Sequence, residues 1–154
     1  MIAGLGIDVC DVARIRRALE APSGARFRAR VFTPGEQAYC EARKRARFES
    51  YAARFAAKEA AMKALGTGWG EGVVWHDVEV VREGDGPPAL RLHGAAAALA
   101  RSRRLGRWHV SLSHTAEVAV ASVIVETATR RAGGRRATAG AAAPPRPTRR
   151  RRGR

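Results

Sequence analysis

A carboxylate and a lysine stand four residues apart in the middle of the sequence, at Glu59 and Lys63. Side chains at this spacing lie on one face of an α-helix, one turn apart. Such a pair suits a metal-bound phosphate, because the carboxylate can bind the cation while the ammonium group neutralises phosphate oxygens. The alternative for this spacing alone is a surface ion pair that adds about 0.3 kcal/mol.

A second carboxylate, Asp8, ends the apolar segment 2–9 beside two glycines. A carboxylate in apolar surroundings costs free energy unless it is paired or bound to a metal. An aspartate that caps the next turn is the alternative. Asp8 and Glu59 are oxygen ligands without a thiolate or histidine cluster, a donor set that favours a hard ion. If both carboxylates bind a metal, Mg²⁺ fits them best, and the capping role of Asp8 stays open.

An imidazole follows the alternating segment 108–113, at His114. Hydroxyl and imidazole groups at the end of a strand suit a phosphate. Serine with histidine could also indicate nucleophilic hydrolysis, but the chain has no Gly-x-Ser-x-Gly elbow. A histidine in an ordinary turn is the third interpretation. The remaining histidines and the two cysteines show no metal-ligand spacing: His76, His93, His109, Cys10 and Cys40.

The elements that must position these groups follow from apolar periodicity and capping signals. Asp11 can cap the first helix, Thr33 and Glu36 form a capping box, Ser50 can cap the long helix, and Gly66 can end it. We expect, in order, a strand at 2–9, helices at 12–19, 34–45 and 50–65, strands at 73–82 and 89–93, a helix at 94–104, and strands at 108–113 and 118–125. This order predicts an α+β fold with a mainly antiparallel sheet and helices packed on one side.

The long helix carries five alanines, which leave it thin enough for a bulky group to approach its backbone: Ala56, Ala57, Ala60, Ala61 and Ala64.

Length and composition bound the class of protein. A chain of 154 residues is one domain by length. It has neither an apolar run of membrane-spanning length nor an N-terminal signal peptide. The two cysteines form no disulfide framework, so we expect a reduced, cytoplasmic protein.

The net charge of +15 is concentrated at the C-terminus. Residues 127–154 contain ten arginines and no acid, whereas residues 1–126 contain 19 basic and 14 acidic residues. We therefore predict a folded domain at 1–126 and a disordered tail at 127–154, because the tail lacks large apolar residues. The tail could bind nucleic acid weakly. A nucleic-acid-binding module is the competing functional class, although the folded part shows no basic, aromatic-interleaved strand.

Three segments resemble the short bacterial members of the 4'-phosphopantetheinyl transferase family, the holo-acyl-carrier-protein synthases: Gly4–Asp8, Arg54–Gly68 and Trp108–Thr115. The resemblance implies transfer of the 4'-phosphopantetheine arm of coenzyme A to a serine of apo-acyl carrier protein, in fatty acid biosynthesis. It also implies a homotrimer with the coenzyme A sites between subunits.

The resemblance further implies residue roles. Asp8 and Glu59 match the magnesium ligands, and Glu59 and Lys63 the catalytic pair. Lys63 is also expected near the pyrophosphate. Four positions match the segments that hold the rest of coenzyme A: Arg54, Gly66, His114 and Thr115.

The resemblance also implies that the first predicted helix binds the protein partner. Arg14 and Arg17 match the surface that contacts the acidic carrier protein, where complementary charge mainly raises the association rate. A carrier domain of polyketide or peptide synthases is the alternative substrate.

Two features depart from the family pattern. The turn at Gly86, Pro87 and Pro88 lacks the lysine that relatives often carry there, and the arginine-rich tail has no counterpart.

Overall fold

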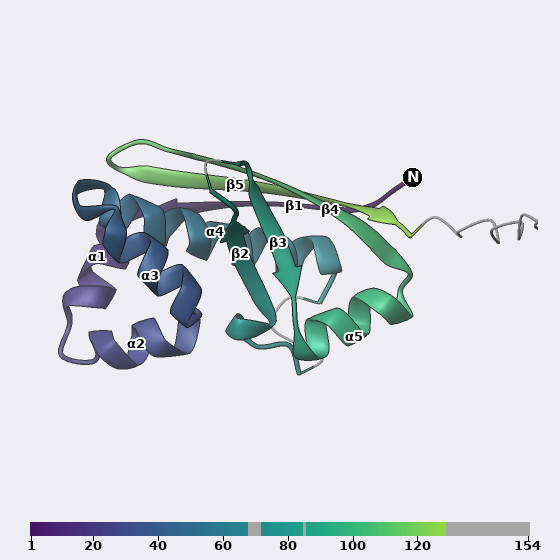
Figure 1. Ribbon diagram of the computed structural model, residues 1–154, viewed down its shortest axis with the longest axis horizontal. Helices are drawn as coiled ribbons and strands as arrows, with labels where there is room; N and C mark the ends of the chain where they lie inside the picture. The colour runs from purple at the N-terminus through teal and green to yellow at the C-terminus, as the bar shows by residue number, and fades with distance from the viewer. Residues whose placement is uncertain (68–71, 85, 129–154) are drawn as a thin grey trace, which may run out of the picture.

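The structure is a computed structural model that describes residues 1–67, 72–84 and 86–128 (Figure 1). Gly68 of the predicted signature segment and residues 129–154 of the predicted tail lie outside these ranges. The elements are β1 (Ile2–Asp11), α1 (Val12–Glu20), α2 (Gly24–Val31), α3 (Pro34–Ala42), the 3₁₀ turn η1 (Lys44–Ala46), α4 (Arg47–Leu65), the 3₁₀ turn η2 (Trp75–Asp77), β2 (Val78–Arg82), β3 (Pro88–Leu92), α5 (Gly94–Ser102), β4 (Leu105–His114) and β5 (Val118–Thr127).

Two antiparallel sheets form the β layer. The larger has the strand order β1-β5-β4, and β2 and β3 form a separate hairpin. The helices lie together on one side of the long strands, with α4 running beneath them (Figure 1). The predicted α+β fold with helices on one side is therefore confirmed. None of the helices within the described ranges is long and apolar enough to span a membrane.

The helix α4 packs unusually close to β1, because glycines on the strand face alanines on the helix. A Cβ atom added at Gly6 would lie 1.9 Å from the Ala60 carbonyl oxygen, and one at Gly4 would lie 2.2 Å from that of Ala64. The alanines of α4 are buried by the fold itself. The expectation that something bulky can approach the helix backbone is met by strand β1 itself, which occupies that space.

We expect Gly6→Ala to destabilise the fold by about 3 kcal/mol, because the backbone must shift to admit the methyl group. Gly35→Ala is the matched control. A Cβ there would meet only side-chain ends, at 3.4 Å from Glu79 Oε1 and 3.9 Å from Thr33 Oγ1. Urea unfolding followed by circular dichroism measures both variants. Equal midpoints for Gly6→Ala and the wild type would contradict the close packing.

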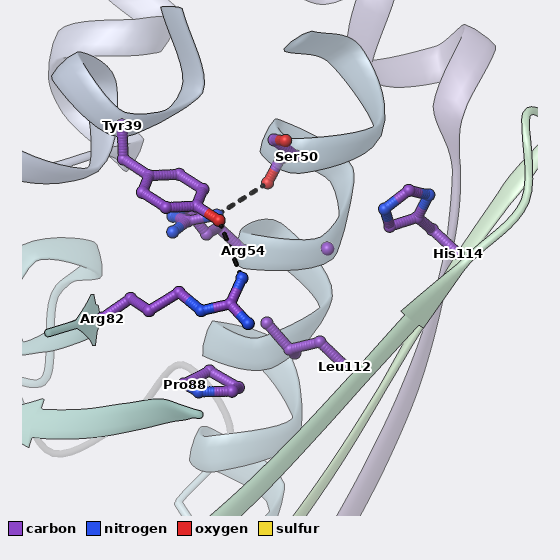
Figure 2. A pocket seen from close by; sticks show the side chains of 8 residues that line it. Tyr39, Ser50, Arg54, Arg82, Pro88, Leu112 and His114 are labelled. Atoms are coloured by element: carbon purple, nitrogen blue, oxygen red, sulfur yellow. Dashed lines mark hydrogen bonds between the residues drawn. The ribbon is translucent and has the colours of Figure 1, made fainter. Parts of the chain in front are cut away.

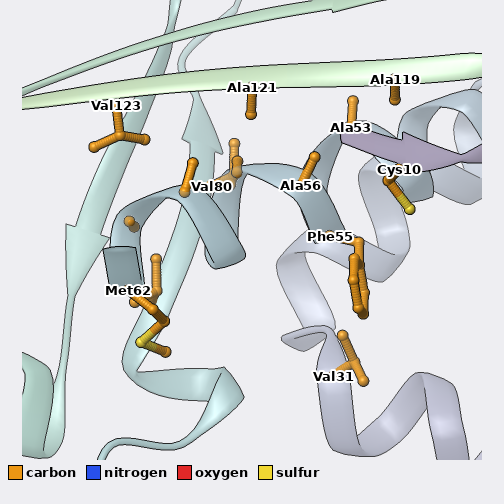
Figure 3. Packing of buried hydrophobic residues seen from close by; sticks show 14 of the residues in the cluster. Cys10, Val31, Ala53, Phe55, Ala56, Met62, Val80, Ala119, Ala121 and Val123 are labelled. Atoms are coloured by element: carbon orange, nitrogen blue, oxygen red, sulfur yellow. The ribbon is translucent and has the colours of Figure 1, made fainter. Parts of the chain in front are cut away.

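The core lies between α4 and the inner face of the larger sheet (Figure 3). Alternate residues of β5 point inward and are fully buried: Ala119, Ala121, Val123 and Val125. The outer face also carries apolar side chains, and there they are exposed. Leu5, Ile7 and Val9 of β1 are 51–62% exposed. Because large apolar patches on a monomer mark interaction sites, this outer apolar stripe needs an explanation.

A buried ion pair fixes α4 against α3 and β2. Lys58 Nζ lies 2.8 Å from Glu36 Oε2, and both side chains have no exposed surface. The ammonium group also donates to the carbonyls of Trp75 and Val78. Glu36 accepts hydrogen bonds from the backbone N–H groups of Thr33 and Val80, each at 2.9 Å. The pair therefore links three elements in the interior.

Three capping predictions are confirmed. The Asp11 carboxylate accepts a 2.7 Å hydrogen bond from Arg14 N. Thr33 and Glu36 form the reciprocal capping box at the start of α3. Gly66 ends α4 in the left-handed conformation, with φ 76°.

One helix was missed, and several boundaries differ from the expectations. Helix α2 was not predicted, and its N-cap residue Ser23 makes no side-chain capping hydrogen bond. Helix α3 ends at Ala42, before the expected end at 45. Helix α4 begins at Arg47, because η1 leads directly into it, so Ser50 lies inside the helix and is not its cap. The predicted strand 73–82 begins only at Val78, after the turn η2.

Candidate active site

One candidate site lies where β1 meets the second half of α4. Asp8 lies on the same face of β1 as the buried residues Gly6 and Cys10, so it faces α4. Its carboxylate lies 2.9 Å from Lys63 Nζ, and the Asp8 side chain is only 17% exposed. Lys63 also donates to the carbonyl of Ile7 at 2.9 Å. The sheet and the helix therefore bring together two residues that are 55 positions apart in the chain.

Glu59 belongs to the same cluster. It lies one turn before Lys63 on α4 and is half-buried. Burial raises the pKa of the Cys10 thiol to about 11; Arg14 opposes this, and the charges of Asp8, Asp11 and Glu59 add to it. Glu59 shares a face of α4 with Lys63 because the two are four residues apart. Asp8, Glu59 and Lys63 form what we call the carboxylate–lysine cluster.

The donor set of this cluster fits Mg²⁺. The ion typically takes one or two carboxylates and completes its shell with water and substrate phosphates. Asp8 already holds a cationic group, the Lys63 ammonium, in the position next to its carboxylate. Within the described ranges no group of three or more His, Cys, Asp or Glu side chains could hold a metal, so a closed zinc-type site is not formed there.

A second group of polar side chains lines a cavity of about 140 Å³ at the other edge of the sheet (Figure 2). The volume is sufficient for several water molecules or a phosphate group. Its wall combines basic, aromatic and apolar residues from α3, α4, β2, β3 and β4, namely Tyr39, Ser50, Ala53, Arg54, Arg82, Pro88, Leu112 and His114. We call it the arginine pocket. Two of the predicted coenzyme-binding residues, Arg54 and His114, lie in it.

Arg54 is nearly buried, with 4% of its surface exposed. Its guanidinium lies 3.8 Å from the centre of the Tyr39 ring, a cation–π contact. Its Nη1 is 3.5 Å from the Ser50 carbonyl, and its Nε has no hydrogen-bond partner. A buried donor without a partner is uncommon in folded proteins, so Arg54 is a candidate ligand-binding residue.

Tyr39 connects three arginines. Its ring contacts Arg54, and its hydroxyl oxygen accepts hydrogen bonds from Arg43 at 2.5 Å and from Arg82 at 3.1 Å. Burial raises the pKa of the Tyr39 phenol, but the hydrogen bonds from Arg82 and Arg43 outweigh it, and the net shift is downward. The pocket is therefore strongly electropositive.

Comparison with known proteins decides the family. A sequence model described as the 4'-phosphopantetheinyl transferase superfamily matches residues 4–122. The chain belongs to this superfamily.

Curated relatives of this transferase agree in sequence. Holo-acyl-carrier-protein synthase of Koribacter versatilis is 52% identical over 126 residues, 82% of this chain and 99% of the relative. The protein of the same description from Anaeromyxobacter sp. strain K is 57% identical over 128 residues, 82% of this chain and 97% of the relative. The resemblance on which the sequence predictions rest is therefore confirmed over most of the chain.

Solved structures agree in fold. Holo-acyl-carrier-protein synthase of Helicobacter pylori, in complex with coenzyme A, superposes with a TM-score of 0.69 at 28% identity, covering 79% of this chain and 99% of that one. The enzyme from Bacillus anthracis, in complex with CoA (3',5'-ADP), gives a TM-score of 0.67 at 36% identity, covering 83% and 99%.

The remaining predicted residues of the transferase belong to neither group. Gly66 is exposed at the end of α4. Thr115 is exposed in the β4–β5 turn, and its hydroxyl accepts hydrogen bonds from the backbone N–H groups of Glu117 and Val118. Arg14 and Arg17 are exposed on α1. Tyr39 and Arg82 were missed from the sequence, because the pocket is assembled from several elements with no local signature.

The carboxylate–lysine cluster and the arginine pocket do not meet within one chain. Asp8 lies on β1 and His114 on β4, the two edge strands of the sheet, which are roughly 10 Å apart. Arg54 and Lys63 are about two and a half turns apart on α4, so their side chains leave opposite sides of the helix. A ligand that contacts both groups must therefore be long enough to reach across β5 or around α4.

Proposed function

We propose that the protein is a holo-acyl-carrier-protein synthase. It transfers the 4'-phosphopantetheine arm of coenzyme A to a serine of apo-acyl carrier protein and releases adenosine 3',5'-bisphosphate, as a step of fatty acid biosynthesis. The observation that carries this proposal is the carboxylate–lysine cluster, in a chain of this superfamily. Relatives of the same description, two of them solved with coenzyme A or its nucleotide part, support the substrate.

The carboxylate–lysine cluster would perform the phosphoryl transfer. Asp8 and Glu59 would hold Mg²⁺, which when bound supplies charge neutralisation at the pyrophosphate oxygens. Lys63, whose side chain is 50% exposed, can turn from Asp8 to the leaving phosphate and stabilise its negative charge. The carrier serine would give its proton to a base, for which Glu59 and a water molecule are the candidates, as its oxygen bonds to the β-phosphorus. The bond from that phosphorus to the bridging oxygen would break, and its electron pair would leave on the 5'-phosphate of adenosine 3',5'-bisphosphate. Positioning and electrostatics account for most of the acceleration in such transfers.

The arginine pocket would bind the nucleotide end of coenzyme A. Two observations support this assignment. The buried Nε of Arg54 has no hydrogen-bond partner, and the imidazole of His114 lines the same pocket. Gly66 and Thr115 are proposed as further contacts, since both are accessible in turns that border the two groups.

We propose a homotrimer with the coenzyme A sites between subunits. Two observations support a shared site. The carboxylate–lysine cluster and the arginine pocket lie at opposite edges of the sheet, so one subunit can supply each to the same ligand. The outer apolar stripe of Leu5, Ile7 and Val9 offers surface that association would bury, which favours it by about 25 cal/mol per Å².

The acidic carrier protein would dock on α1. Arg14 and Arg17 are exposed there, and Arg14 lies 5.5 Å from the Phe55 ring of α4, one turn before Glu59. Binding on this helix therefore brings the carrier serine toward the carboxylate–lysine cluster. Weak binding of nucleic acid by residues 127–154 is proposed only as a side activity of their charge.

The test is intact-mass spectrometry of apo-acyl carrier protein after incubation with this protein, coenzyme A and Mg²⁺, with a parallel sample in EDTA. We expect a phosphopantetheine-sized mass gain that EDTA prevents. A gain that persists in EDTA would remove the proposed magnesium dependence. A gain only with carrier domains of polyketide or peptide synthases would change the substrate, and no gain with any carrier would overturn the transferase.

Deletion of the arginine-rich tail distinguishes the transferase from a nucleic-acid-binding module. A chain that ends at residue 127 is expected to keep its transfer rate, whereas a protein whose main function is tail-driven nucleic-acid binding loses its affinity and its salt dependence.

A further inference from the structure

A third basic side chain reaches the arginine pocket from the end of β2. Arg82 lies on the pocket wall opposite His114, with its guanidinium between Tyr39 and Leu112 (Figure 2). Its Nε donates a 2.6 Å hydrogen bond to the Gly86 carbonyl, and its Nη1 donates to the Tyr39 hydroxyl. The side chain is thus held at two points although it is exposed. Such a fixed guanidinium presents its remaining donors in a defined direction.

The arginines around the pocket have no carboxylate partner among the residues that the structure describes. Arg43, Arg54 and Arg82 all contact Tyr39, and within the described residues none of the three forms an ion pair with a carboxylate. Like charges held around one phenol repel each other, and an anion in the cavity would relieve this repulsion. The pocket is therefore built for a ligand that carries more than one negative charge.

The chemistry of the donors selects a phosphate monoester. Planar guanidinium groups match the oxygen geometry of phosphate, and His114 can add a donor from the opposite wall. Coenzyme A has two phosphate groups of different kinds. In the proposed function its pyrophosphate lies at Lys63, on the other side of α4, so the 3'-phosphate is the dianion that remains for this pocket.

We infer that Arg82, oriented by Tyr39, is a further substrate-binding residue that recognises the 3'-phosphate of coenzyme A. The inference rests on the proposed function. The turn at Gly86, Pro87 and Pro88 carries no basic side chain, and Arg82 is the cation that hydrogen-bonds to this turn. Tyr39 is a positioning residue in this arrangement, because it holds Arg82 through its hydroxyl and Arg54 through its ring.

The experiment compares coenzyme A with 3'-dephospho-coenzyme A as donors in steady-state transfer to acyl carrier protein. For Arg82→Ala we expect the KM for coenzyme A to rise about tenfold, the value of one charge-assisted hydrogen bond. The KM for the dephospho donor is expected to change less than about twofold. Arg82→Lys should raise the KM for coenzyme A by less than Arg82→Ala does, because the charge remains although the two-point attachment is lost.

Two further variants sharpen the comparison. Tyr39→Phe keeps the ring against Arg54 and removes the hydroxyl. It should raise the KM for coenzyme A but not that for the dephospho donor, and by less than Arg82→Ala does. Arg91→Ala removes an exposed arginine from the same hairpin, on β3, and should leave both donors unaffected.

The outcomes separate this inference from the proposed function. Equal increases in KM for both donors, or no increase for either, would overturn the role of Arg82 while wild-type transfer stands. An Arg91→Ala effect as large as that of Arg82→Ala would overturn it as well, since it would indicate general surface charge. Absence of transfer by the wild type overturns the proposed function and this inference together. Titration of wild type and Arg82→Ala with adenosine 3',5'-bisphosphate and adenosine 5'-monophosphate gives a binding readout independent of turnover.

Discussion

Glu59→Ala is expected to reduce phosphopantetheine transfer by about 1,000-fold, because it removes one of two proposed metal ligands and a carboxylate beside the reacting phosphate. The variant should fold normally. Glu59 is only half-buried, it lies outside the apolar core, and alanine is the strongest helix former. Loss of activity with an unchanged unfolding midpoint is therefore the expected combination.

The rate is measured by the mass assay across a range of Mg²⁺ concentrations, and the midpoint by circular dichroism. Glu59→Gln keeps the shape of the side chain and should lose nearly as much activity, because the charge is what binds the cation. Glu83→Ala, an exposed carboxylate on the β2–β3 turn, is the control and should be unaffected. Unchanged turnover of Glu59→Ala at limiting Mg²⁺ would remove Glu59 from the metal site.

Lys58→Met is expected to destabilise the fold by about 4 kcal/mol, the usual result of removing one partner from a buried ion pair. The loss leaves the Glu36 carboxylate uncompensated in the interior, where both side chains have no exposed surface. It also leaves the carbonyls of Trp75 and Val78 without their donor. The effect is therefore larger than that of losing a surface charge.

Urea unfolding measures this loss. The double variant Lys58→Met with Glu36→Gln should recover part of it, because the buried charge is removed while an oxygen remains to accept the Val80 N–H. Arg101→Met on α5 exposes the same new side chain at the surface and should change stability by no more than about 0.5 kcal/mol. A loss for Lys58→Met no greater than this control would show that the pair is not important for stability.

The features predicted correctly from the sequence depend on short-range interactions. The Asp11 cap, the capping box and the Gly66 stop each involve residues within four positions of each other. Helix α2 and the true start of α4 were missed for the complementary reason. Neither begins with a side-chain cap, so packing and the preceding turns determine where they start.

The candidate site divides in the same way. Asp8, Glu59 and Lys63 could be named because they stand in recognisable segments, and the structure places Lys63 on Asp8. Lys58 precedes Glu59 directly in the same segment, yet it points into the interior, since its partner Glu36 is contributed by another helix. Arg82 reaches Tyr39 over 43 positions of sequence. Contacts at such separations depend on the tertiary fold, so no local sequence pattern predicts them.

The pairing of β1 with β5 has a consequence for folding during synthesis. In the order β1-β5-β4, β1 hydrogen-bonds to β5, and the backbone N–H of Thr127 donates to the Met1 carbonyl at 2.9 Å. A nascent chain makes β1 first and must hold it without its sheet neighbour until residues 118–127 have left the ribosome, at roughly 5–20 residues per second. Since Asp8 sits on that strand, the carboxylate–lysine cluster is expected to be completed only after β5 has been made, although its own three residues all lie within the first 63 positions.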